Sequence, residues 1–193
     1  STMHLLLSSL ALLSTALVAI ASPACLSGRN LTDSKAENAT SLTTTTPKPK
    51  NELPEEFYGK FTLDHSENFD EYLEAVGYSW FTRKLVTLAT FEKVFTRGAH
   101  NTFDYDNLTT KKNVWYKRIT LGMEFEGEGL DSEQHKITFF MRDGNLVERH
   151  IPINRGGEAK DEEYEYYFEG DFLIVRMEAN GVEGKRFYKR VSY

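Results

Sequence analysis

Cysteine is almost absent from this chain of 193 residues, and its scarcity excludes several kinds of structure. Cys25 is the one cysteine, so no disulfide can form within the chain. A protein without such cross-links has to be held together by its apolar core. Because Cys25 lies close to a candidate processing site, it can stay a free thiol, pair with a second chain or be removed. No arrangement of residues around it marks a catalytic nucleophile.

Patterns that mark metal, nucleotide and nucleic-acid sites are also missing. The five histidines lie far apart, and no glycine-rich phosphate loop occurs. The formal net charge is −6 and no concentrated basic stripe is present, which argues against binding to nucleic acid. The acidic run 161–169 is interpreted as a solvated outer face rather than a catalytic carboxylate pair. We therefore expect neither an enzyme nor a need for a metal or cofactor.

The one long apolar run of the chain lies near its first residue. Residues 5–20 are nearly all apolar or small, and Ala19-Ile20-Ala21 forms an A-x-A cleavage site. This pattern predicts a secretory signal peptide over 1–21, although its first residues contain His4 in place of lysine or arginine. A transmembrane anchor is the alternative, but the run is short for a bilayer and lacks a basic stop sequence. With no second apolar segment, the mature protein is expected to be secreted, soluble and extracellular.

Residues 22–53 are rich in serine, threonine, asparagine and proline, with little apolar surface to offset the entropy lost on ordering. We expect a disordered tail here. Asn30 and Asn38 stand in N-glycosylation sequons, and the threonine run 43–46 is a candidate for O-glycosylation. A third sequon at Asn107 falls in the folded part, where occupancy depends on an exposed loop. Chance matches to so short a motif are the alternative for all three.

Residues 54–193 are long enough to form one domain with its own core. The alternation of residues 59–63 predicts a strand, and it leads directly into a helical pattern. Two helices are predicted, because Gly77 suits the end of the first and Ser79 the N-terminal cap of the second. Their apolar stripes are Phe69, Leu73 and Val76 in the first helix and Phe81, Leu85 and Leu88 in the second.

The rest of the domain alternates apolar and polar residues in short runs separated by turn residues, the pattern of an antiparallel barrel. Hairpin turns are indicated at Asp143-Gly144, Glu169-Gly170-Asp171 and Asn180-Gly181. Ten strands are predicted, at 57–63, 91–97, 102–107, 113–120, 123–127, 134–142, 145–151, 162–168, 171–178 and 182–191.

The segment from Gly59 to Val76 resembles the signature of the fatty-acid-binding proteins, the intracellular lipid-binding protein family. Three further segments are similar to that family: 81–85 in the second helix, 121–125, and the Arg-x-Tyr pair of the last strand. Together they cover residues 54–192, essentially the whole folded part.

The resemblance implies an all-β, calycin-like fold: a ten-stranded antiparallel up-and-down β-barrel, or β-clam, capped by a helix-turn-helix lid. It also implies a lipid-binding domain over 54–193. The polar loops 97–101 and 155–161 are longer than in typical intracellular members. In these loops and in its leader, the chain is similar to the secreted nematode subgroup.

Arg186 and Tyr188 lie two residues apart on the last predicted strand, so their side chains point to the same face. In the family that the chain resembles, this pair faces the cavity and holds the carboxylate of the ligand, a task that suits a forked guanidinium and a phenol. A solvated basic strand is the alternative. The resemblance implies a second cavity arginine at Arg149, which stands between Val147 and Ile151 on one face. Its alternative is an exposed residue on a strand of the opposite phase.

Four basic residues are predicted to surround the entrance of the barrel. They are Arg83 and Lys84 on the second helix, with Lys111 and Lys112 in a turn placed beside it. Such a rim could contact anionic membranes transiently during ligand transfer. Ordinary solvated surface charges are the alternative, because lysine is common on exposed helix faces.

The favoured hypothesis is a secreted carrier that reversibly binds long-chain fatty acids and transports them through extracellular fluid. Retinoids are the alternative ligand, because the family's retinoic-acid binders use a similar Arg-x-Tyr end. A different class is an extracellular structural or host-interacting glycoprotein that uses the barrel as a scaffold. An enzyme, such as a barrel-based isomerase, fits least because the thiol or metal that it would need is missing.

Overall fold

The computed structural model describes residues 51–153 and 161–193. The predicted signal peptide, nearly all of the predicted tail, Asn30, Asn38 and Cys25 lie outside the described residues. Among the residues that are described, no helix is long and apolar enough to cross a membrane.

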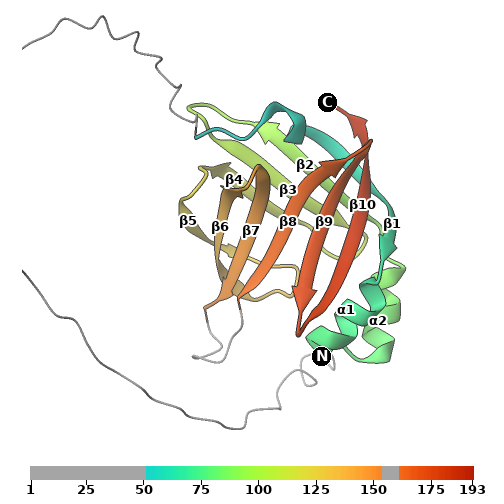
Figure 1. Ribbon diagram of the computed structural model, residues 1–193. Helices are drawn as coiled ribbons and strands as arrows, with labels where there is room; N and C mark the ends of the chain where they lie inside the picture. The colour runs from blue at the N-terminus through green and yellow to red at the C-terminus, as the bar shows by residue number, and fades with distance from the viewer. Residues whose placement is uncertain (1–50, 154–160) are drawn as a thin grey trace, which may run out of the picture. The chain divides into compact units, whose positions relative to one another are not determined.

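The described residues form ten strands, two α-helices and one short 3-10 helix, shown in Figure 1. The predicted strands are all found. In chain order the elements are η1 (Glu55–Phe57), β1 (Gly59–Glu67), α1 (Phe69–Val76), α2 (Trp80–Thr87), β2 (Phe91–Arg97), β3 (Phe103–Thr109), β4 (Val114–Ile119), β5 (Glu124–Glu128), β6 (Gln134–Arg142), β7 (Asn145–Pro152), β8 (Glu162–Glu169), β9 (Phe172–Ala179) and β10 (Val182–Ser192).

One antiparallel sheet wraps around to form the predicted barrel, with the order β4-β3-β2-β1-β10-β9-β8-β7-β6-β5. The first and last strands pair with each other, which joins the two ends of the domain. Strands β4 and β5 follow each other in the chain but are the two edges of the sheet. The barrel is therefore closed everywhere except between these two strands (Figure 1).

Alternating side chains fill the inside of the barrel with aromatic rings. Phe103 of β3 and Phe139 of β6 meet edge to face inside the barrel, with ring centroids 5.6 Å apart. At the end of the barrel opposite the helices (Figure 1), η1 places Phe57 against Phe168 with centroids 5.3 Å apart. Burial of such rings is a main source of stability in a domain that has no disulfide.

The folded domain starts before Pro54. Leu53 is 2% exposed and belongs to the core, and the Asn51 side-chain amide donates to the carbonyl oxygen of Leu121 at 3.0 Å. The prediction of a disordered tail over 22–53 is therefore wrong for its last three residues. A single buried leucine offers the apolar contact that the rest of the tail sequence lacks.

Helix α1 is fixed at both ends to the hairpin formed by β9 and β10. Asn68, at the start of the helix, donates its amide to the Glu183 carbonyl oxygen at 2.6 Å. Asn180, in the hairpin turn, donates to the Ala75 carbonyl oxygen at 2.6 Å. Phe69 and Leu73 of the predicted stripe are buried, whereas Val76 is exposed.

Helix α2 does not bury the apolar stripe that its sequence contains. Its buried residue is Arg83, whose guanidinium lies 3.3 Å from the Asp70 carboxylate and 3.2 Å from that of Glu74. Because charged side chains are seldom buried unless they are paired, these two carboxylates of α1 hold the rotation of α2. The apolar stripe of this helix is exposed instead. The exposed apolar residues of this segment include Trp80, Phe81, Leu85 and Leu88.

Candidate ligand-binding site

Strand β10 directs Arg186 and Tyr188 into the barrel, on the shared face that alternation predicts. The two residues are 6% and 1% exposed. The guanidinium carbon of Arg186 lies 3.8 Å from the ring centroid of Phe91 and 4.3 Å from that of Phe69. Aromatic faces attract a cation, so these rings partly compensate for the water that Arg186 has lost.

Arg186 has no acidic partner among the residues that the structure describes. No carboxylate in the described part of the chain forms an ion pair with it, and its buried Nε has no hydrogen-bond partner. Burial lowers the pKa of Arg186 and Tyr188 opposes that shift, but an arginine keeps its proton in proteins. Burial also raises the pKa of Tyr188, which leaves a neutral phenol beside the cation. Because an unpaired buried charge is unfavourable, this site is suited to an anionic group.

Lys93 adds a second interior cation that the sequence interpretation missed. It is 5% exposed on β2, between Phe91 and Phe95 on the inward face. Its Nζ donates to the hydroxyls of Tyr105 at 2.6 Å and Tyr166 at 3.1 Å. The alternating Phe-x-Lys-x-Phe pattern was the available signal, but lysine is so seldom buried that the pattern favours exposure.

Glu148 supplies the interior acid, at 3% exposure on β7. Tyr166 donates its hydroxyl to one carboxylate oxygen, and Nε2 of His150 lies 2.8 Å from the other. Burial alone would raise the pKa of Glu148, but the hydrogen bond with His150 and the charges of His150 and Lys93 outweigh it, so the pKa is lowered. The carboxylate is therefore ionised, and Tyr166 links it to Lys93.

Arg149 does not share this interior, so its predicted place in the cavity is wrong. Residue 148 pairs with Phe139 on one side and Tyr164 on the other, and both of these side chains belong to or pack against the core. Cross-strand partners point to the same face, so Glu148 faces inward and Arg149 outward. There Arg149 pairs with Asp161, a hydrogen bond that raises the pKa of the guanidinium.

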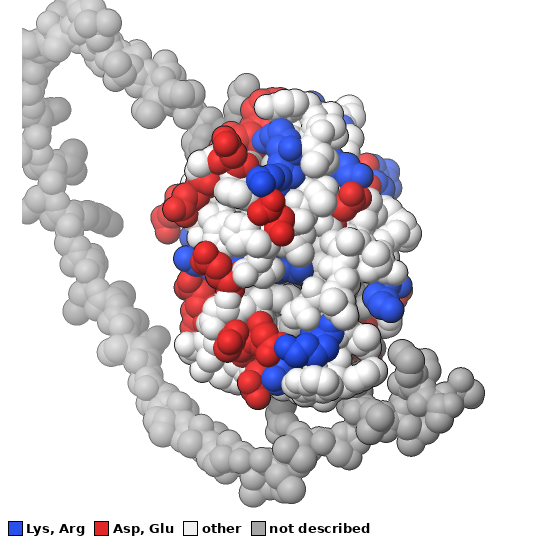
Figure 2. Space-filling view, turned by 90° about the vertical axis from the view of Figure 1, so that its right-hand side faces the viewer, with Lys and Arg blue, Asp and Glu red and all other residues white. Residues whose placement is uncertain are grey.

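Three of the four residues predicted as a basic portal rim, Arg83, Lys84 and Lys112, pair with acidic side chains. Arg83 lies between the two helices, while Lys84 is 48% exposed and lies 3.4 Å from Asp70. Lys111 is exposed, whereas Lys112 is held at the turn between β5 and β6. On the face drawn in Figure 2, acidic and basic side chains are interspersed. The partners of Lys112 are Glu128, Gly129 and Ser132.

Asn107, the third sequon, lies within strand β3 rather than in a loop. It occupies the same face as the buried Tyr105, and its Oδ1 is buried without a hydrogen-bond partner. The exposed loop that glycosylation requires is therefore not present at this position.

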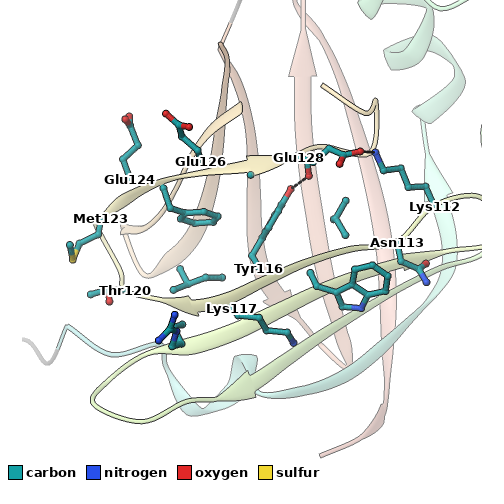
Figure 3. Close-up of a pocket in the computed structure, with 15 residues that line it drawn as sticks. Lys112, Asn113, Tyr116, Lys117, Thr120, Met123, Glu124, Glu126 and Glu128 are labelled. Atoms are coloured by element: carbon teal, nitrogen blue, oxygen red, sulfur yellow. Dashed lines mark hydrogen bonds and ion pairs between the residues drawn. The ribbon is translucent and has the colours of Figure 1, made fainter. Parts of the chain in front are cut away.

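A separate pocket of about 570 Å³ opens between the two edge strands, β4 and β5 (Figure 3). Tyr116 extends across this gap from β4 and donates its hydroxyl to the Glu128 carbonyl oxygen at 3.0 Å. Neither Arg186 nor Tyr188 lines the pocket, so it is distinct from the candidate site. No cluster of three or more His, Cys, Asp or Glu suited to a metal occurs among the described residues.

Comparison with known proteins identifies the family. No family model matches the chain. The chain is 62% identical over 141 residues to fatty acid-binding protein homolog 2 of Caenorhabditis elegans. The aligned region covers 72% of this chain and 87% of that protein. A solved structure, As-p18, described as an extracellular fatty acid binding protein, is 45% identical with a TM-score of 0.69, over 72% of this chain and 99% of that one. A more distant relative, retinoid-binding protein 7 of Homo sapiens, is 26% identical over 140 residues, covering 72% of this chain and 99% of that protein. From the identity and coverage of the first of these relatives, together with the ten-stranded barrel and its two helices, the chain belongs to the fatty-acid-binding protein family.

Proposed function

We propose that the protein is a secreted carrier that reversibly binds long-chain fatty acids inside the barrel. The observation that carries this proposal is Arg186, a buried guanidinium with aromatic rings on its faces and no acidic partner among the described residues. A fatty-acid carboxylate would supply the anion, with Tyr188 beside it as a hydrogen-bond donor. Its relatives in Caenorhabditis elegans and the As-p18 structure are named as fatty acid-binding proteins, which supports the same ligand class.

The two parts of a fatty acid would contribute differently to affinity. Each methylene removed from water contributes about 0.8 kcal/mol, so a long acyl chain supplies most of the binding free energy. A hydrogen bond to a charged group contributes about 1.5–3 kcal/mol net, so Arg186 mainly selects and orients the carboxylate. An alcohol or an ester would leave the buried guanidinium without its anion, which is unfavourable. This difference favours free acids as ligands.

Transport in extracellular fluid is part of the proposal. The apolar leader over 1–21 has the pattern of a secretory signal peptide, and the tail that follows contains the sequons at Asn30 and Asn38. The description of As-p18 as extracellular supports the same location for this chain. A secreted carrier of this kind would hold sparingly soluble fatty acids in solution between cells.

Ligand transfer would involve transient contact of helix α2 with anionic membranes. Trp80 and Phe81 are each 65% exposed, and Lys84 lies on the same short helix. Aromatic side chains enter the interface of a bilayer, and a neighbouring cation favours anionic lipids. Arg83 would take no part, because its charge is already paired with Asp70 and Glu74.

Retinoids are a second candidate ligand. A relative with 26% identity is named as a retinoid-binding protein. Retinoic acid carries a carboxylate at the end of an apolar chain, so Arg186 and Tyr188 would suit its head group equally well.

Extraction of the native ligand from the secreted protein, followed by mass spectrometry, tests these proposals. We expect long-chain free fatty acids, and less of them from Arg186→Gln purified in the same way. A retinoid in the extract would support the second candidate instead. Protein that is reproducibly empty, and that also fails to bind added oleate and retinoic acid, would contradict both and favour the structural or host-interacting role.

A further inference from the structure

Lys93 is a buried amine that the proposed carboxylate site does not use. Its Nζ lies 5.2 Å from the ring centroid of Tyr105, 5.2 Å from that of Tyr166 and 5.6 Å from that of Tyr188. Within the described ranges no carboxylate forms a direct ion pair with it, and its two hydrogen bonds go to the hydroxyls of Tyr105 and Tyr166. An amine in such aromatic surroundings is easier to deprotonate than one that contacts an acid.

The charge state of Lys93 differs from that of a surface lysine. Burial lowers its pKa to about 8, with the Glu148 carboxylate opposing the shift and the charge of Arg186 adding to it. At pH 7.4 roughly a fifth of the molecules would then carry the neutral amine, compared with roughly one in a thousand for an ordinary lysine. The neutral amine is the nucleophilic form, and desolvated lysines are the ones that proteins use to form Schiff bases.

We propose that Lys93 forms a reversible imine with a long-chain aliphatic aldehyde bound inside the barrel. The inference rests on the proposed function in one respect, since the aldehyde has to enter the interior as a fatty acid would. It adds a second class of ligand, at a different oxidation level, held through a covalent bond to nitrogen instead of an ion pair.

The surrounding groups suit each step of imine formation. The Nζ lone pair forms a bond to the carbonyl carbon, and the carbonyl oxygen takes up a proton to give a carbinolamine. The carbon–oxygen bond then breaks, the hydroxyl leaves as water, and a carbon–nitrogen double bond forms. Tyr105 and Tyr166, at hydrogen-bond distance from Nζ, can donate and recover the proton. The net change is the amine and the aldehyde giving an imine and one water, with no oxidant or reductant.

Glu148 provides a counter-charge for the product. Its carboxylate accepts the hydroxyl hydrogen bond of Tyr166, so the negative charge lies one residue away from Nζ. A protonated imine has the same charge as the lysine ammonium that it replaces, and the existing network can therefore accommodate it. The three linked groups, Lys93, Tyr166 and Glu148, come from strands β2, β8 and β7.

The amine and the guanidinium are placed to receive the same end of a ligand. The ring centroid of Tyr188 lies 5.6 Å from Nζ of Lys93 and 6.0 Å from the guanidinium carbon of Arg186. A carboxylate has no carbon that an amine attacks under these conditions, so an acid would remain an ion pair of Arg186. An aldehyde cannot form that ion pair, but it can react with Lys93.

Reductive trapping tests the imine on the full chain. Wild-type protein is incubated with hexadecanal and sodium cyanoborohydride, and the adducts are located by peptide mapping. We expect Lys93 to be labelled, and excess hexadecanoate to reduce its labelling at least tenfold. Labelling of exposed lysines such as Lys136, which is 48% exposed, should not respond to hexadecanoate. Mapping the wild type locates the adduct without any variant that has to fold.

Two variants and a binding assay separate this inference from the proposed function. Lys93→Arg should abolish the interior adduct, whereas Lys136→Arg should retain it, and wild-type protein is assayed in parallel for binding of a fluorescent fatty acid. If the Lys93 peptide stays unlabelled in wild-type protein that binds the fluorescent fatty acid, the imine is overturned and the carrier proposal stands. If neither the fatty acid nor the aldehyde enters the protein, both are overturned.

Discussion

A Cβ atom placed on Gly184 would lie 2.9 Å from the Cβ atom of Tyr72, closer than two such atoms approach in proteins. Helix α1 therefore lies directly on strand β10, and only a residue without a side chain leaves room for it. Arg186 is two residues further along the same strand, and the first residue of the helix, Phe69, covers its guanidinium. The close contact at Gly184 thus holds the lid over the candidate site.

Gly184→Ala should displace the lid. The added methyl group overpacks the contact with Tyr72, for which we expect a loss of about 1–3 kcal/mol in the free energy of unfolding and faster dissociation of a bound fatty acid. Urea unfolding and stopped-flow release of a fluorescent fatty acid measure the two effects. Gly144→Ala is the control, because its Cβ would meet nothing within 4 Å and its cost comes from a φ of +88° alone. Equal release rates in both variants would contradict the prediction.

Arg186→Gln should weaken the binding of a long-chain fatty acid by about 1–3 kcal/mol and leave its methyl ester almost unaffected, because only the anion uses the charge. Folding should survive, since the change removes a buried cation that has no acidic partner among the described residues. Competition of acid and ester against a fluorescent fatty acid measures the difference. Arg149→Gln is the matched control, on the outer face. If Arg186→Gln binds the acid with unchanged affinity, Arg186 is not the residue that binds the carboxylate.

Arg83 and Lys84, neighbours on α2, should respond differently to substitution. Arg83→Gln breaks the pairs with Asp70 and Glu74 and should lower the free energy of unfolding by about 1 kcal/mol. Lys84→Glu reverses an exposed charge and should slow ligand transfer to anionic vesicles with little change in equilibrium affinity. Transfer rates at several vesicle charges and salt concentrations measure the second effect. If the transfer rate of Lys84→Glu depends on neither vesicle charge nor salt concentration, transfer by diffusion through water is favoured.

Lys93 should make stability depend on pH in a defined window. The pKa is about 8 in the folded protein against 10.5 ordinarily, so between these values the unfolded chain binds more protons and stability rises with pH. The whole window corresponds to about 3 kcal/mol. Urea unfolding from pH 7 to 9.5 should show wild type gaining stability relative to Lys93→Met. The same comparison with Lys136→Met, at an exposed lysine, should show no such gain. If the difference in the free energy of unfolding between wild type and Lys93→Met stays constant with pH, the lowered pKa of Lys93 is contradicted.

Processing of the secreted product can be predicted in the same way. The A-x-A site at 19–21 leads us to expect a mature chain that begins near Ser22 and carries glycan on Asn30 and Asn38. N-terminal sequencing and glycosidase treatment measure both. Asn107→Gln should leave the electrophoretic mobility unchanged, because the residue lies in a strand with its amide oxygen buried. An intact leader retained in membranes would contradict the prediction of secretion.

Much of the barrel could be predicted because it depends on local patterns. Alternation of apolar residues and the turn residues between them locate the ten strands, and alternation alone puts Arg186 and Tyr188 on one face. Local patterns did not fix the rotation of α2. Its apolar stripe indicates a buried face, yet the pairing of Arg83 with Asp70 and Glu74 turns that stripe outward.

The inward face of β7 and the interior charges were decided by tertiary structure. Val147 and Ile151 gave Arg149 apolar neighbours in the sequence, but pairing with β6 and β8 aligns Glu148 with Phe139 and Tyr164 and so turns Glu148 inward. Lys93 can be buried because three tyrosines surround its amine, Tyr105 of β3, Tyr166 of β8 and Tyr188 of β10. No spacing along the chain encodes the meeting of these strands inside the barrel. The sequence by itself determined the strands, their alternation and the family, because these depend on neighbours along the chain. The register between strands determined which charged groups meet inside the barrel, because cross-strand pairing sets which face each side chain occupies.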